Sequence, residues 1–309
     1  MTKKNMNTVS GKVETIDEVV FNCLQPKKLT TDQSNLVLNF KRSVEAKIEK
    51  AGDGRNWGIE EIPLFLPDVD LAYQRFLKNR EVAKIVNKFD INKVEVKSAS
   101  IRKVDGKWRI FLMDGAHTLS ALLFMQAMGY PVNSMTVKLF VGLTQAQEAD
   151  LFATQNEGHT NIRGYERYKA ELCAGHANAL AIDKVLKEFG LTTKVNYNST
   201  INRNRNINAI EELYRIEATG GEDALRFVFS VIQRLGWGAQ EMAYTQRVLA
   251  GLRSVYKSCK DNPEKETALI CGMKTWGTCE DFLKEAQNTD KYEGHPAQKV
   301  RAYLNGLIG

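Results

Sequence analysis

Cysteine is scarce in this chain, and its few cysteines form no pattern that binds metal or builds a disulfide framework. The 309 residues include five cysteines and four histidines, with no CxxC pair and no histidine at a metal-ligand spacing from a cysteine. This odd, scattered set argues against a zinc site and predicts no metal centre made by the protein alone. We expect reduced thiols, mostly packed in the core of a cytoplasmic protein.

Long apolar runs and familiar catalytic motifs are also missing. No run approaches the roughly 20 apolar residues that a membrane span requires. Residues 1–12 are polar and lack the apolar stretch of a secretory signal. We therefore expect no membrane association. The sequence contains no GxSxG, no Walker A loop and no HExxH, so it offers no convincing nucleophile constellation.

The composition that remains is that of an ordinary globular protein. Hydrophobic residues make up 43% of the chain and charged residues 26%, and the length suits about two domains. The formal net charge is +6. This small excess is compatible with a polyanionic partner and equally with a solvated, mildly basic surface.

The residue pattern divides the chain into three parts and predicts an α+β fold. Residues 1–55 form a charged N-terminal extension with one helix over Leu36–Lys50, which Thr30-Thr31-Asp32-Gln33 can cap. Residues 56–160 form a mixed α/β domain, and residues 161–309 form an all-helical domain.

Turn and cap signals locate the elements of the α/β domain. Asp105-Gly106 predicts a hairpin between two strands, and Thr144 with Gln147 predicts a capped helix. The other expected elements there are helices over 79–89 and 119–128 and strands over 94–101, 108–113 and 135–141. In the helical domain we expect helices over 165–189, 206–218, 224–236, 245–259, 265–273, 278–286 and 296–307.

The most informative segment is Asp114-Gly115-Ala116-His117-Thr118, between a strand pattern and a helix pattern. A helix that begins here leaves backbone N–H groups without intrahelical partners, at the positive end of the helix dipole. Such a place binds phosphate or carboxylate, and His117 and Thr118 add side-chain donors. Asp114 can cap the helix or hold a metal, and His117 can move a proton. The alternative is an ordinary turn.

Three further segments are candidates for contacts with the same ligand or with nucleic acid. In Tyr73-Gln74-Arg75, the guanidinium of Arg75 can reach a phosphate. In the polar loop after Gln155, Asn156 can bind ligand oxygens and Arg163 can support them. Arg203 and Arg205 alternate with asparagines, which suits contacts to a DNA backbone. The alternative for Arg75 is an ordinary surface arginine on a linker. The alternative for the loop after Gln155 is a junction between two helices, and that for Arg203 and Arg205 is a solvated loop.

The order of these motifs resembles the ParB/sulfiredoxin-like superfamily, in particular its phage and mobile-element branch with a DGxHR box, often labelled ParB-like nuclease proteins. The resemblance covers about residues 57–170, and the helical remainder is similar to that branch as well. The residues that carry it are Tyr73-Gln74-Arg75, Phe89-Asp90, Asp105-Gly106, Asp114-Gly115-x-His117, Gly142-Leu143-Thr144, Glu148, Leu151-Phe152 and Asn156.

The resemblance implies a small α/β fold whose DGxHR-type turn binds nucleotide phosphates. Relatives of this fold serve as a CTP-dependent DNA clamp, as an ATP-using sulfinic-acid reductase and as a small-molecule kinase, so the fold leaves the function open. Ala116 stands where the reductase needs a cysteine, which excludes that chemistry. Thr118 replaces the final arginine of the box, and a neutral hydroxyl binds phosphate less strongly than a guanidinium. The kinase's catalytic glutamate has no counterpart that we can place.

The leading hypothesis is a nucleotide-regulated protein that binds DNA or acts in DNA transactions. CTP or ATP with Mg²⁺ would be the cofactor, DNA the partner, and a homodimer is allowed. The first alternative is an enzyme that hydrolyses nucleotide, transfers phosphate or cuts nucleic acid, with His117 and Asp114 as catalytic residues. The second is an interaction module with a vestigial site. The expected nucleotide site comprises Arg75, Asp114, Gly115, Ala116, His117, Thr118, Asn156 and Arg163.

Overall fold

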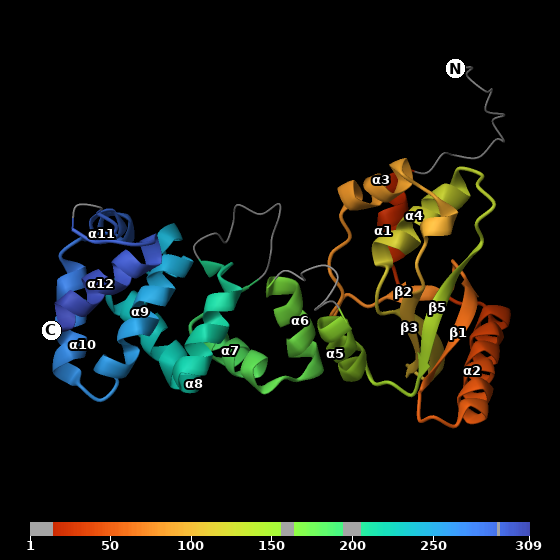
Figure 1. Ribbon diagram of the computed structural model, residues 1–309, viewed down its shortest axis with the longest axis horizontal. Helices are drawn as coiled ribbons and strands as arrows, with labels where there is room; N and C mark the ends of the chain where they lie inside the picture. Colours follow the sequence, from red (N-terminus) through yellow and green to blue (C-terminus); the bar gives the residue numbers. More distant parts are fainter. Residues whose placement is uncertain (1–14, 156–163, 194–204, 289–290) are drawn as a thin grey trace, which may run out of the picture. The chain divides into compact units, whose positions relative to one another are not determined.

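The computed structural model describes residues 15–155, 164–193, 205–288 and 291–309. The chain divides into two compact units, residues 1–162 and residues 163–309 (Figure 1). The first unit is mixed α/β and the second, where described, is helical, which confirms the predicted fold class. The predicted three-part division into domains stays a prediction, because compactness does not test which parts fold independently.

A five-stranded mixed sheet organises the first unit. Its strand order is β1-β5-β3-β4-β2. The β1–β5 and β3–β4 pairs are antiparallel, whereas the β3–β5 and β2–β4 pairs are parallel. The strands are β1 (Trp57–Pro63), β2 (Pro67–Val69), β3 (Lys97–Val104), β4 (Lys107–Leu112) and β5 (Ser134–Val141).

Helices pack against this sheet and share its core. Val20 and Cys23 of α1 and Val37 of α2 are buried in one cluster with sheet residues such as Ile101 and Leu139. Residues 16–51 therefore contribute to the core of the α/β unit rather than only preceding it. The helices of this unit are α1 (Ile16–Leu24), α2 (Thr31–Ala51), α3 (Asn79–Asn87), α4 (Ala116–Ala127) and α5 (Gln145–Gln155).

Local signals located most elements of this unit, and three elements differ from the expectation. Asp105 and Gly106 both have positive φ, 49° and 79°, as the expected two-residue hairpin turn requires. The sequence analysis missed α1, and it assigned no strand near Pro63 and Pro67. These prolines end β1 and begin β2, the two edge strands, where a missing N–H is tolerated.

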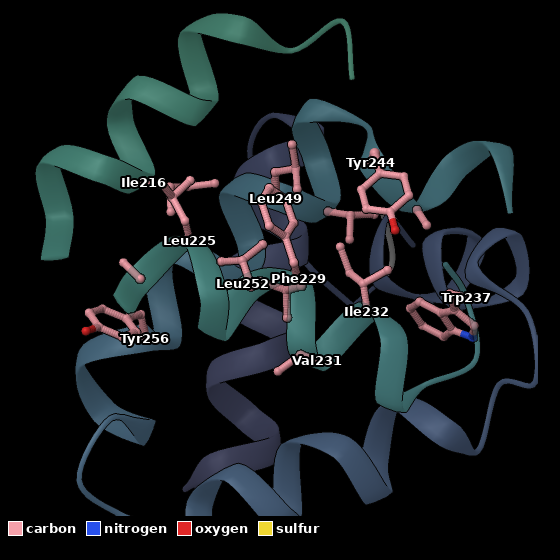
Figure 2. Packing of buried hydrophobic residues seen from close by; sticks show 14 of the residues in the cluster. Ile216, Leu225, Phe229, Val231, Ile232, Trp237, Tyr244, Leu249, Leu252 and Tyr256 are labelled. Carbon is pink, nitrogen blue, oxygen red and sulfur yellow. The ribbon is translucent and has the colours of Figure 1, made fainter. Parts of the chain in front are cut away.

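The second unit surrounds a large aromatic and aliphatic core. Phe229 and Trp237 are fully or almost fully buried, and Figure 2 shows them among branched side chains from several helices. The helices of this unit are α6 (Gly164–Ala174), α7 (Ala177–Glu188), α8 (Ile210–Arg234), α9 (Gln246–Cys259), α10 (Pro263–Lys274), α11 (Cys279–Ala286) and α12 (Pro296–Ile308).

Glycines interrupt the helices of the second unit at two places. The single helix expected over 165–189 is wrong: Gly175, with a φ of 82°, separates α6 from α7. The helices expected on either side of Gly220 and Gly221 run together as α8, but these two residues are not helical. A side chain at Gly220 would lie 2.4 Å from the Tyr256 ring, so the kink allows α9 to approach closely.

In the described ranges, no helix is both long and apolar enough to cross a membrane.

Candidate functional site

The Asp114–Thr118 turn joins the end of β4 to the start of α4. The N–H groups of Met113 and Asp114 both donate to the Ser98 carbonyl of β3, at 2.7 and 3.1 Å, so the turn lies against the first residues of β3. Gly115 is the N-cap of α4, with a φ of 93°. This left-handed conformation favours glycine, and it lets the chain pass from strand to helix within three residues.

The N-terminus of α4 presents hydrogen-bond donors that are not used. The first helical bond runs from the Leu119 N–H to the Gly115 carbonyl, at 2.8 Å. No side chain caps the helix and its first turn contains no acidic residue, so Asp114 does not have the capping role that it could have had. Among the residues that the structure describes, the N–H groups of Ala116 and Thr118 and the Thr118 hydroxyl have no acceptor. These donors suit an anion.

Lys97 is a second feature of the turn, and the sequence analysis missed it. The Lys97 methylenes cover Gly115 so closely that a side chain there would lie 2.6 Å from Lys97 Cγ. Its Nζ lies 3.1 Å from a Glu95 carboxylate oxygen and 3.9 Å from Asp114 Oδ2, and the side chain is only 14% exposed. A largely buried lysine side chain, paired with Glu95, therefore lies beside the positive end of the α4 dipole. Both the ammonium and the helix end would attract an anion at this position.

Residues 73–78 run along the same turn. The buried Gln74 amide donates to the carbonyls of Leu112 and Met113, at 2.8 and 2.6 Å. The Lys78 N–H donates to His117 Nε2, at 3.1 Å. The structure thus brings together two segments that the sequence analysis treated separately. Arg75, between these two anchors, is half-buried and has no ion-pair or hydrogen-bond partner in the described residues.

His117 holds α3 in place. Lys78 is the N-cap of α3 and provides no side-chain cap, so its bond to the His117 ring fixes the start of that helix. His117 Nε2 is the acceptor of this hydrogen bond. While the bond exists, Nε2 cannot take a proton from a substrate.

Glu148 of α5 is the centre of a buried polar network beside the site. Its carboxylate accepts from the Tyr73 hydroxyl at 3.1 Å, from Arg102 Nε at 3.0 Å and from the Ser100 hydroxyl. Arg102 also binds Asp70, which accepts from the Gln145 amide at 2.8 Å. Burial raises the pKa of Glu148, and the hydrogen bonds from Ser100 and Arg102 oppose this rise. The motif order included Glu148 but gave it no role.

Of the other candidate residues of the sequence, the structure describes only Arg205. Asn156, Arg163 and Arg203 lie outside the described residues. Arg205 belongs to the second unit, where its side chain is exposed and its carbonyl accepts from the Thr192 N–H at 2.9 Å. In the described ranges, no group of three or more histidine, cysteine, aspartate or glutamate side chains could hold a metal ion.

Most arginines described in the second unit are neutralised by nearby carboxylates. Arg226 pairs with Glu188 and Glu222, and Arg253 pairs with Glu212. Further pairs join Arg167 to Glu211 and Arg234 to Glu266. A surface that binds DNA through phosphates needs unpaired cations, and Arg205 has no such carboxylate partner in the described part of the chain.

Comparison with known proteins gives several similar solved structures and one family. The C-terminally truncated chromosome-partitioning protein ParB from Caulobacter crescentus, in complex with CTP-gamma-S, is 10% identical, with a TM-score of 0.28 over 82% of this chain and 99% of that chain. Similarity at this score supports no conclusion about fold or function. No curated protein matches the sequence. The model of DUF6551, a family of unknown function, matches residues 70–293, and the chain therefore belongs to the DUF6551 family.

Proposed function

We propose that the Asp114–Thr118 turn binds the phosphates of a nucleoside triphosphate, and that the bound nucleotide regulates DNA binding in a ParB-like, phage or mobile-element protein. One observation carries this proposal. Gln74 and Lys78 fasten the segment that contains Arg75 to the turn, where α4 has unused donors. The motif order of the ParB/sulfiredoxin-like superfamily supports it from the sequence.

The turn and its neighbours offer a phosphate two kinds of group, neutral hydrogen-bond donors and positive charges. The N–H groups of Ala116 and Thr118 and the Thr118 hydroxyl supply neutral donors, and Gly115 leaves no side chain in their way. Lys97 and Arg75 supply positive charge from β3 and from the segment before α3. Lys97 thereby replaces the charge that is lost because Thr118 stands at the arginine position of the motif.

A magnesium ion with the nucleotide fits the same turn. Mg²⁺ typically binds one or two protein carboxylates together with phosphate oxygens and water. The Asp114 carboxylate is 38% exposed, so it can take part in such a set. The ion would neutralise phosphate charge, and Asp114 would orient it. CTP and ATP are the two nucleotides that the resemblance suggests.

DNA contacts would come from the second unit, through Arg203 and Arg205. Such contacts act on phosphates, so affinity should fall steeply with added salt. Fluorescence anisotropy with duplex DNA at increasing salt tests this part. Weak binding at low salt that does not respond to salt would remove DNA from the proposal.

Calorimetric titration with CTP, ATP, GTP and UTP, each with and without Mg²⁺, tests the nucleotide site. Lys97→Met keeps the methylenes over Gly115 but removes the charge, so we expect about tenfold weaker binding. Lys103→Met, at an exposed position near the other end of β3, is the matched control and should bind like the wild type. Wild-type protein that binds none of the four nucleotides would refute the proposal.

The enzymatic alternative gains no support from the geometry. Its base would be His117, whose Nε2 is engaged by the Lys78 N–H. His117→Ala would also remove the anchor of α3, so loss of activity in that variant would not identify a catalytic role.

A further inference from the structure

The Tyr73 side chain joins the segment that carries Arg75 to α5. The Tyr73 hydroxyl donates to Glu148 Oε2 at 3.1 Å, and neither side chain is exposed. The Tyr73 ring also packs against Phe152, one turn further along α5, with ring centroids 6.0 Å apart. Tyr73 is thus fixed to α5 at both its polar and its apolar end.

The same carboxylate is fixed to the sheet. Ser100 and Arg102 of β3 both donate to Glu148, and the Arg102 guanidinium lies 3.7 Å from the centre of the Phe111 ring of β4. Two residues of the sheet therefore hold Glu148 where Tyr73 meets it. The Asp70 carboxylate accepts hydrogen bonds from Arg102 and Gln145, so the start of the segment is anchored to the same network.

Arg75 lies between residues whose side chains or backbone are held by hydrogen bonds, while its own side chain has no hydrogen-bond or ion-pair partner in the described residues. Tyr73 is held by Glu148, Gln74 is held by the carbonyls at the end of β4, and Lys78 is held by His117. The backbone at Arg75 is therefore confined between fixed points. A binding residue held in this way loses less entropy when it meets its ligand.

We propose that Glu148 is a positioning residue of the anion site, and that it acts through Tyr73 to hold Arg75 in place for a nucleotide phosphate. This inference rests on the proposed function. Glu148 itself does not touch the ligand. A carboxylate suits the role because it accepts three donors at once, whereas the amide of glutamine would turn one of its own donors toward them.

Two variants test the inference, each alone and combined with Arg75→Ala. Tyr73→Phe removes only the bond between the segment and Glu148, and Glu148→Gln disturbs the whole network. We expect Tyr73→Phe to weaken nucleotide binding roughly fivefold, the effect of one hydrogen bond. In the Arg75→Ala protein the same change should have no effect, because the side chain that it positions is gone.

Tyr168→Phe is the matched control. Tyr168 is as buried as Tyr73 but lies in the second unit, and its hydroxyl has no partner among the described residues. It should leave nucleotide affinity unchanged. A purely structural role for Tyr73 would weaken binding by the same factor with and without Arg75.

Each outcome decides one question. Wild-type binding with a Tyr73→Phe loss that depends on Arg75 supports the inference. Wild-type binding with no loss, or with a loss independent of Arg75, overturns the inference and leaves the proposed function standing. Absence of wild-type binding overturns both. If Arg75→Ala binds too weakly to measure, amide hydrogen exchange is the second test. The inference requires that residues 70–78 lose protection from exchange in Tyr73→Phe while β3 and β4 keep theirs. Unchanged protection of residues 70–78 would refute the inference.

Discussion

The two units bury polar groups in different ways. The α/β unit buries Gln74, Ser100 and Glu148 close to the candidate site, and the hydrogen bonds of these side chains reach across strands and helices. The helical unit has the larger apolar cluster, and the buried polar side chains in its described residues are Glu166, Glu212 and Lys299, of which Glu212 pairs with two arginines. Buried polar networks specify one arrangement at a cost in stability, whereas an apolar core mainly stabilises. The unit whose buried hydrogen bonds link strands and helices around one carboxylate is the unit where we place the ligand.

The largest expected effect compares one core aromatic residue from each unit. Phe229→Ala and Phe152→Ala each empty an almost fully buried site, so each should lower the free energy of unfolding by about 3–5 kcal/mol. Only Phe152 packs against Tyr73, so only Phe152→Ala should also weaken nucleotide binding. Urea unfolding and calorimetry measure the two effects. If Phe229→Ala weakened nucleotide binding as much as Phe152→Ala, the proposed difference between the α/β unit, which holds the site, and the helical unit would be refuted.

A smaller effect compares two glycines that both lie under a neighbouring side chain. An alanine at Gly220 would lie 2.4 Å from the Tyr256 ring, so overpacking should cost about 1–3 kcal/mol. An alanine at Gly115 would keep a left-handed φ, at about 1–2 kcal/mol, and would displace Lys97.

Nucleotide affinity distinguishes the two glycine variants. Gly115→Ala should lose nucleotide affinity, because Lys97 is displaced and the added methyl group obstructs access to the backbone donors of α4. Gly220→Ala should keep its nucleotide affinity. Thermal unfolding confirms that both variants fold before the titrations are compared. Full affinity in Gly115→Ala would show that no ligand approaches this turn closely.

The contributions of Glu148 in the α/β unit and of Glu222 in the helical unit to the pH dependence of stability should have opposite signs. Burial raises the pKa of Glu148 above its ordinary value of 4.5. Above pH 4.5 the folded protein therefore keeps a proton that the unfolded chain has released, and this group's contribution falls as the pH rises through the raised pKa. In the helical unit, hydrogen bonds from Lys184 and Arg226 lower the pKa of Glu222. Its contribution is therefore present above pH 4.5 and is lost as the pH falls below it.

Variants of the Glu148 network separate these two trends. Glu148→Gln should flatten the decline of stability as the pH rises above 4.5. Ser100→Ala removes a hydrogen bond that lowers the pKa of Glu148, so it should extend the decline to higher pH. Denaturant unfolding at a series of pH values measures both. An unchanged slope in both variants would mean that Glu148 does not titrate in this range.

The contacts that build the site were not predictable from the sequence, although most of the fold was. The hairpin at Asp105-Gly106 follows from adjacent residues, because a local turn conformation demands those types. The site depends instead on contacts between residues far apart in sequence, such as Lys97 on Gly115 and Gln74 on Leu112. No local pattern encodes which strand end meets which helix start. The sequence therefore indicated the turn but not the lysine that covers it.

The smallest effect should be the same in both units, because it depends on local sequence alone. Thr30 caps α2. Its hydroxyl oxygen accepts a hydrogen bond from the Gln33 N–H, and the Gln33 side-chain oxygen accepts one from the Thr30 N–H. Asn262 caps α10 by accepting the Lys265 N–H at 3.0 Å. Thr30→Ala and Asn262→Ala should each cost about 1 kcal/mol in denaturant unfolding, with nucleotide affinity unchanged. A cap in the α/β unit that altered affinity would show that the site depends on more of that unit than the segment between Asp70 and Lys78.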